Sequence, residues 1–243
     1  MWDPRTYVDT DYGLEPGESF EPDDALDPDG DVDPGAPHVM TVLGPILPED
    51  LGICLPRARI LRVPGGAGED ARLDREDAAV AELEAYATTG GRAVVDCSTP
   101  GDGRNAAGLV RVAGVVPLHV IGATGWHAAA ADTGVVDGAA LEEALKWDVA
   151  QGMDGTNARA GMLAVVAAGP PEDEREQAAI AAVARAHAST GVPISAVARD
   201  GSPDALVVAL AQAGADSARI VVGQVDRLRD WEEVVALARS GVF

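Results

Sequence analysis

The stretch LGPILPEDLGICLPRARIL, residues 43–61, decides the fold, because it has the pattern of the first strand of a barrel-forming α/β domain. Residues 52–55 are apolar and are expected to enter the interior, and the segment then reaches Arg57 and Arg59. Side chains two positions apart on a strand face the same side. We therefore expect two guanidiniums to project together from the end of one strand, and their role is the question that the sequence raises.

Beyond Val39, short apolar runs alternate with amphipathic stretches, a pattern typical of parallel βα units. The expected strands are residues 52–61, 92–97, 118–123, 159–167, 192–198 and 220–224. The expected helices are residues 75–87, 106–113, 138–150, 172–188, 203–213 and 231–240. Strands buried on both faces form continuous apolar runs, so these six units predict a parallel sheet covered by helices. A barrel and a doubly wound sheet both fit this pattern.

The chain divides into an acidic leader and a larger α/β domain. Residues 1–38 contain twelve Asp or Glu and one Arg, are rich in Pro and Gly, and show no periodicity, which predicts an extended or disordered segment. Within it, DPDGDVDPG from Asp27 resembles a calcium loop, but an EF-hand needs Gly at its sixth position and Glu at its twelfth, where Val32 and His38 stand. We expect residues 39–243 to form one domain rather than two.

Composition excludes several kinds of partner. The net charge of −22 argues against nucleic acid and against anionic membranes, because both are bound through Lys and Arg. The sequence has neither a long apolar run nor the basic and apolar start of a signal peptide, which favours a cytoplasmic protein. The two cysteines, Cys54 and Cys97, lie in apolar strand-like runs and are interpreted as buried thiols.

Several segments, in order, resemble the phosphotriesterase-related family of the amidohydrolase superfamily. They are VMTVLGPILPEDLGICLP from Val39, VVDCSTPGDGRN from Val94, LHVIGATGWH from Leu118, DGTNARAGML from Asp154, TGVPISA from Thr190 and ARIVVGQVDR from Ala218. The resemblance covers about residues 40–243. It implies an α/β fold of the TIM-barrel type, here incomplete with about six βα units, and membership among metal-dependent hydrolases of phosphotriesters or lactones.

The metal ligands that the resemblance implies are absent. The family pairs two His at the end of the first strand, where Arg57 and Arg59 stand. Its ligands on the fourth, fifth and sixth strands match Ala164, Val197 and Gln224, and the eighth strand has no counterpart. A protonated guanidinium offers no lone pair to a metal. The remaining groups do not replace the ligands, since His38 is in the leader, His119 within a strand, and His187 and Lys146 on helices. We expect no metal and no cofactor.

Arg57 and Arg59 would occupy the space of the missing metals. Paired guanidiniums at the carboxyl ends of barrel strands can hold the carboxylate or phosphate of an anionic small molecule, which is the less favoured of two interpretations. The alternative is internal neutralisation by carboxylates at neighbouring strand ends, namely Asp96, Asp102, Asp200 or Asp226. We include Trp126, Gln224 and Asp226 with the two arginines as ligand-binding candidates. His127, which follows the third strand, is the catalytic candidate, and its alternative is an exposed loop residue.

Three functions follow from these residues. The first is a metal-free phosphotriesterase-like pseudoenzyme that acts as a binding or assembly partner. The second is a repurposed, metal-independent enzyme for cyclisation, isomerisation or elimination that uses Arg57, Arg59 and His127. The third is a relic hydrolase with a displaced metal site.

An open parallel sheet leaves unpaired backbone groups on its first and sixth strands, and such edges promote aggregation unless they are covered. The acidic leader can fold over them, but burying its carboxylates is costly. We therefore expect another chain to cover the edges, either in a homodimer or in a complex with a homologous partner.

Overall fold

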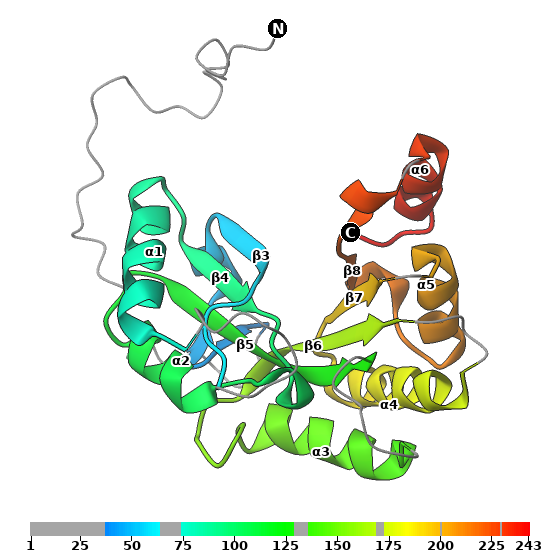
Figure 1. Ribbon diagram of the computed structural model, residues 1–243, viewed down its shortest axis with the longest axis horizontal. Coiled ribbons are helices and arrows are strands. Elements are labelled where there is room, and N and C mark those ends of the chain that lie inside the picture. The colour runs from blue at the N-terminus through cyan, green and yellow to red at the C-terminus, as the bar shows by residue number, and fades with distance from the viewer. Residues whose placement is uncertain (1–36, 64–73, 129–135, 169–172, 200, 229) are drawn as a thin grey trace, which may run out of the picture.

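The structure is a computed structural model, and it describes residues 37–63, 74–128, 136–168, 173–199, 201–228 and 230–243 (Figure 1). Almost all of the expected leader, with its calcium-loop alternative, lies outside these residues, and so does Asp200.

Six parallel strands form the main sheet. They are β3 (Cys54–Ala58), β4 (Ala93–Asp96), β5 (His119–His127), β6 (Ala160–Ala167), β7 (Ile194–Ala198) and β8 (Ile220–Val222). Their spatial order is β3-β4-β5-β6-β7-β8, the same as their order in the chain. A doubly wound sheet reverses its strand order at a switch point, whereas a barrel does not. The sheet is therefore the barrel type, and Figure 1 shows it curled into an incomplete ring.

A helix follows each strand and packs on the outside of the curled sheet (Figure 1). The helices are α1 (Glu76–Thr88), α2 (Ala106–Ala113), α3 (Gly138–Ala150), α4 (Glu174–Thr190), α5 (Pro203–Gln212) and α6 (Trp231–Arg239). All six lie where the sequence predicts them. Most begin at a short polar residue whose side chain accepts a hydrogen bond from the first turn, as Asn105 does from the Gly108 amide and Asp137 from the Ala139 amide. Such caps satisfy amides that have no partner inside the helix.

The two faces of the sheet have different contents. On β6, Leu163 and Val165 point outward into the core formed with α3, α4 and α5. Met162 and Ala164 point inward and pack with Val95 and other small residues from β4 and β5. This alternation follows from the pleat of a strand. The inner face therefore holds a narrow apolar base, and polar groups gather above it at the carboxyl ends of the strands.

Strand β5 is longer than the sequence predicts, because it continues past Ala123 to His127. Gly125 makes this possible. It has φ +154°, and a Cβ placed there would lie 1.8 Å from the Ala164 carbonyl oxygen of β6. With glycine at this position the two strands stay paired as far as His127 and Val166.

A short antiparallel hairpin, β1 (Val39–Thr41) and β2 (Gly44–Ile46), precedes the barrel and was not predicted. It packs at the amino end of β5, where the Val42 amide donates to the Val120 carbonyl at 2.8 Å.

The expectation that residues 52–55 enter the interior was wrong, because Ile53 and Leu55 are 65% and 43% exposed. Strand β3 is an edge strand with one strand neighbour, β4, so no strand in the described part of the chain pairs with its other flank.

Phe243 lies along the outer edge of β8. Its amide donates to the Ile220 carbonyl at 3.0 Å, and its carbonyl accepts from the Val222 amide at 2.7 Å. These two bonds follow the hydrogen-bond pattern of a parallel strand pair. None of the helices in the described part of the chain is both long enough and apolar enough to cross a membrane.

Candidate functional site

A pocket of about 770 Å³ lies at the carboxyl ends of the strands, on the inner side of the curled sheet. This volume is typical of small-molecule sites. We call it the arginine pocket, and it is lined by Arg57, Ala58, Arg59, Asp102, His127, Val166, Val197, Arg199, Gln224 and Arg227.

Arg57 reaches across the sheet from β3. Its Nη1 donates to the Ser195 hydroxyl of β7 at 3.1 Å, and its stem passes over Gly223, where a Cβ would lie 3.1 Å from the Arg57 Cδ. Among the described residues, no carboxylate forms an ion pair with Arg57. Burial is the largest influence on the pKa of Arg57 and lowers it, and the neighbouring charge of Arg59 acts in the same direction. Cys97 and Asp102 oppose this shift without forming an ion pair with Arg57, so the described part of the pocket holds a partly buried cation that no carboxylate contacts directly.

Arg59 is neutralised inside the protein. Its Nη2 lies 2.8 Å from Oδ2 of Asp102, a carboxylate that is 1% exposed. The contact lacks the angle of a directed hydrogen bond, so we treat it as an ion pair. Arg62 binds the other oxygen of Asp102 at 2.8 Å and also donates from Nε to the Asp102 carbonyl.

Of the other carboxylates considered as partners of the two arginines, Asp96 and Asp226 do not pair with them, and Asp200 lies outside the described residues. Asp96 accepts hydrogen bonds from the amides of Ile60 and Ser98 at 2.7 and 2.8 Å and so fixes the backbone after β3. Asp226 is exposed and is not part of the pocket lining. Within the described residues, the internal-neutralisation alternative thus applies to Arg59, and no carboxylate there pairs with Arg57.

Two further arginines enter the pocket from the far end of the sheet. Arg199 directly follows β7, and Arg227 ends the short helical turn η6 (Val225–Arg227) after β8. Both are exposed, and neither has a carboxylate partner among the described residues. Gln224 has φ +63°, and its Oε1 accepts a hydrogen bond from Arg227 Nη1 at 3.1 Å.

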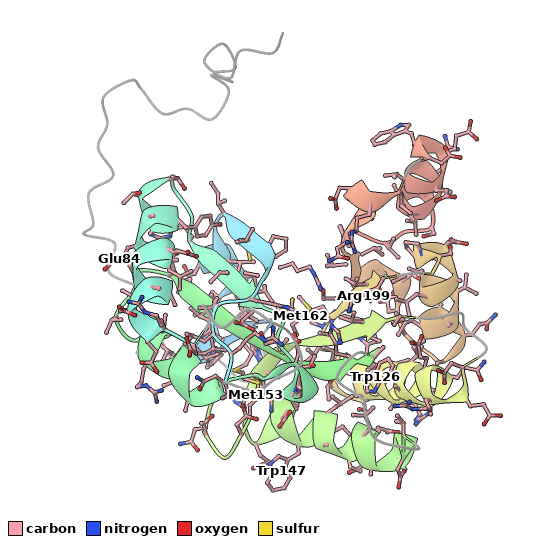
Figure 2. The ribbon with its side chains drawn as sticks, in the orientation of Figure 1. Glu84, Trp126, Trp147, Met153, Met162 and Arg199 are labelled. Carbon is pink, nitrogen blue, oxygen red and sulfur yellow. The ribbon has the colours of Figure 1, made fainter. Side chains whose placement is uncertain are left out.

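His127 lines the pocket, but Trp126 does not, because adjacent residues of a strand face opposite sides. Trp126 packs in the outer core on the side of the sheet covered by α4 (Figure 2). The expected placement of Trp126 in the ligand site was based on a strand that ended at Ala123.

Burial lowers the pKa of His127 from its ordinary value of 6.5. The Asp102 carboxylate opposes this shift, whereas the guanidiniums of Arg59, Arg199 and Arg57 add to it, so the pocket favours the neutral form of the imidazole.

The donor set does not fit the two-metal centre that the resemblance implies. Arg57, Arg59, Val197 and Gln224 line the pocket at positions that match metal ligands, while Ala164 lies in the apolar base beneath it. None of these five side chains supplies imidazole, carboxylate or thiolate. No group of three or more His, Cys, Asp and Glu that could hold a metal ion exists within the residues that the structure describes.

Comparison with known proteins identifies the family. The model of the phosphotriesterase family matches residues 37–243. This chain belongs to that family. The chain is 28% identical to human N-acetyltaurine hydrolase over 184 residues. This alignment covers 72% of this chain and 52% of that protein. It is also 29% identical over 170 residues to a phosphotriesterase-related protein of Nematostella vectensis, covering 68% of this chain and 49% of the relative. The chain therefore spans about half the length of these relatives.

Solved structures of phosphotriesterase-family enzymes share the fold. A mutant of organophosphorus hydrolase from Deinococcus radiodurans superimposes with a TM-score of 0.74 at 29% identity, covering 86% of this chain and 69% of that one. A lactonase from Listeria monocytogenes gives a TM-score of 0.76 at 22% identity, covering 85% of this chain and 71% of that one. The second likeness is evidence for the fold alone. Both structural matches agree with the incomplete TIM-type barrel described above.

Sequence reasoning missed Arg199 and Arg227 as pocket residues, and it considered Asp102 only as a partner of arginine. A usable signal was present, since Arg199 follows directly after an expected strand and Arg227 lies three residues beyond another. Barrel sites are built at these strand ends. Listing every charged residue there would have found both arginines.

Proposed function

We propose that this phosphotriesterase-family chain binds a small organic anion in the arginine pocket and does not carry out the two-metal hydrolysis of its family. The observation that supports this is the lack of a carboxylate partner, among the described residues, for Arg57, Arg199 and Arg227. Guanidiniums in a partly enclosed pocket bind carboxylate, sulfonate or phosphate groups through charge-assisted hydrogen bonds. In this proposal the chain is a pseudoenzyme with respect to metal hydrolysis.

Binding can be tested by thermal unfolding of the 243-residue chain with a panel of anions. The panel should include phosphate, acetate and N-acetyltaurine, the compound in the names of several relatives. We expect at least one anion to raise the midpoint of unfolding, because a ligand that binds only the folded state stabilises it. The double variant Arg57→Met/Arg199→Met should lose the shift. Arg239→Met, an exposed arginine at the far end of α6, is the matched control and should keep it.

The metal part of the proposal has its own test. We expect purified protein to contain no stoichiometric zinc, manganese or cobalt and to hydrolyse neither phosphotriesters nor lactones above background. Elemental analysis before and after chelation measures the first, and assays with added metal measure the second. One equivalent of metal that is lost on mutation of pocket residues would contradict the proposal.

A second candidate function is metal-independent catalysis, and the observation that favours it is the neutral His127 beside Arg57 and Arg59. A neutral imidazole can accept a proton from a bound substrate while the guanidiniums stabilise developing negative charge. Cyclisation, isomerisation and elimination need these elements and no metal. Once a ligand is known, its conversion to a product by the wild type, and its binding without conversion by His127→Gln, would distinguish an enzyme from a binding protein.

We also propose that another polypeptide chain, either a second copy or a homologous chain, covers the free edge of β3. The support is the exposure of Ile53 and Leu55 beside backbone groups that pair with no strand among the described residues. Light scattering on the 243-residue chain should give a mass above that of a monomer, and Ile53→Lys should reduce it. Val115→Lys is the control, because Val115 is also 65% exposed but lies after α2. A monomeric wild type at micromolar concentration would refute association.

A further inference from the structure

The charges and the apolar lining of the arginine pocket restrict the class of ligand. We infer that the pocket takes an extended organic dianion with an aliphatic spacer, such as an α,ω-dicarboxylate, rather than a monoanion or a compact inorganic anion. One anionic group lies at Arg57 and the other at Arg199 and Arg227. This inference rests on the proposed function, since it specifies the anion that the pocket binds.

The first argument is the charge of the lining. Four guanidiniums and one carboxylate line the pocket, and that carboxylate, Asp102, is already shared between Arg59 and Arg62. Arg57, Arg199 and Arg227 are thus left without an acidic partner among the described residues. A single carboxylate would leave most of this positive charge uncompensated. A ligand with two anionic groups compensates more of it.

The second argument is the separation of the unpaired cations in depth. Arg57 lies low in the pocket, where it is hydrogen-bonded to the buried hydroxyl of Ser195 and packed on Gly223. Arg199 and Arg227 are exposed and come from the ends of β7 and β8, so they form part of the rim. An anion as small as phosphate fills a minor part of the 770 Å³. A longer molecule can place one group at the base and the other at the rim.

The third argument concerns the surface between the cations. Ala58, Val166 and Val197 also line the pocket, and they offer no hydrogen-bonding side chain. An aliphatic chain buries its methylene groups against such a surface, whereas a heavily hydroxylated spacer would lose hydrogen bonds to water there. The pocket therefore matches two charged ends joined by an apolar middle.

Isothermal titration calorimetry of the 243-residue chain can test this with matched ligands. The probes are the dicarboxylates from succinate to suberate, each compared with its monoamide, which keeps the length and removes one charge. At the best length we expect the dicarboxylate to bind at least tenfold more tightly than the monoamide. Arg227→Gln should reduce this ratio below threefold, whereas the control Arg239→Gln should leave it unchanged. Because Arg227 is exposed, its replacement is not expected to impair folding.

The outcomes separate this inference from the proposed function. Equal binding of a dicarboxylate and its monoamide would overturn the dianion inference and leave the anion-binding function standing. Tighter binding of inorganic phosphate than of any dicarboxylate would also overturn it, because the site would then be suited to a compact anion. Failure of every anion to bind the folded wild type would overturn both.

Discussion

Arg104 is a buried guanidinium and Arg57 a partly buried one, both in segments that follow or end a strand, but their surroundings are opposite. Arg104 follows β4 and donates from Nε and Nη2 to the two oxygens of Asp154, at 3.1 and 2.6 Å. Its Nη1 donates to Asp148 at 2.8 Å, and the same Asp148 oxygen accepts from the Thr124 hydroxyl at 2.6 Å. Burial by itself lowers the pKa of Arg104, but these carboxylates outweigh burial and raise it.

Arg57 donates to one neutral group among the described residues, the Ser195 hydroxyl, and burial lowers its pKa. The difference shows that Arg104 is a structural residue, whose ion pairs connect parts of the fold. The Arg104 network joins the loop before α2 to α3 and to the loop before β6, and its charges are compensated within the protein. In the arginine pocket, Arg57, Arg199 and Arg227 have no carboxylate partner among the described residues, which is the arrangement that the proposed anion-binding function requires.

The strongest test of this contrast is Arg104→Met. It leaves Asp148 and Asp154, whose side chains are 14% and 35% exposed, without their cation. Removing one partner of a buried ion pair is strongly destabilising, so we expect a loss of about 3 kcal/mol in the free energy of unfolding. Urea denaturation measures it, and the affinity of the pocket for its anion should not change.

The matched control for Arg104→Met is Arg111→Met. Arg111 forms an ion pair with Glu76 on the surface, where solvent weakens the interaction, so its loss should be far smaller than that of Arg104. Equal destabilisation by the two variants would show that the buried network has no special role.

Arg57→Met is expected to give the reverse result. Replacing a partly buried, uncompensated cation with an apolar side chain of similar length should change the free energy of unfolding by less than about 1 kcal/mol. Anion binding should fall at least tenfold, about 1.4 kcal/mol, because the deepest guanidinium of the pocket is gone. Urea denaturation and calorimetry on one preparation measure both. A large loss of stability together with unchanged anion binding would show that Arg57 has a structural role instead of a binding role.

Much of the fold could be predicted from the sequence, because buried parallel strands and amphipathic helices leave strong periodic patterns. The six βα units were predicted correctly. The end of β5 was not, since a glycine inside an apolar run resembles a turn signal, and only the close approach of Gly125 to β6 shows why the strand continues. The hairpin Val39–Ile46 was missed because each of its strands has three residues, too few to show a period.

The site was predicted in part. The spacing of Arg57 and Arg59 placed both on one pocket, and the strand-end position of His127 placed it there too. Sequence alone could not show that Asp102 would neutralise Arg59 and not Arg57, because that depends on the path of the loop after β4. For Trp126 the sequence left both pocket lining and packing open, and the structure places it in the outer core, because neighbouring residues of a strand face opposite sides of the sheet.

His127 offers a smaller test, through pH. Burial and the guanidiniums of Arg59, Arg199 and Arg57 hold its pKa below 6.5 despite the Asp102 carboxylate, so near and below pH 6.5 this imidazole is protonated to a greater extent in the unfolded chain than in the folded one. Stability of the unliganded protein should therefore fall as the pH falls through this range. A bound anion favours the imidazolium and raises the pKa, so its affinity should increase about threefold between pH 7.5 and 5.5. His127→Gln should remove this dependence in calorimetry, and a persistent dependence would place the titrating group elsewhere.

The smallest expected effect comes from moving Arg57 without removing its charge. Gly223 packs against the Arg57 stem, and a Cβ there would lie 3.1 Å from Arg57 Cδ and 3.0 Å from Val197 Cγ2. Gly223→Ala should shift the guanidinium by a few tenths of an ångström and weaken anion binding about twofold to threefold, since charge-assisted hydrogen bonds depend on direction. Gly114→Ala is the control, because the nearest atom to its Cβ would be 3.5 Å away and its φ is −71°. If Gly223→Ala binds the anion as tightly as Gly114→Ala does, the packing of the Arg57 stem on Gly223 does not set the orientation of the Arg57 guanidinium toward the ligand.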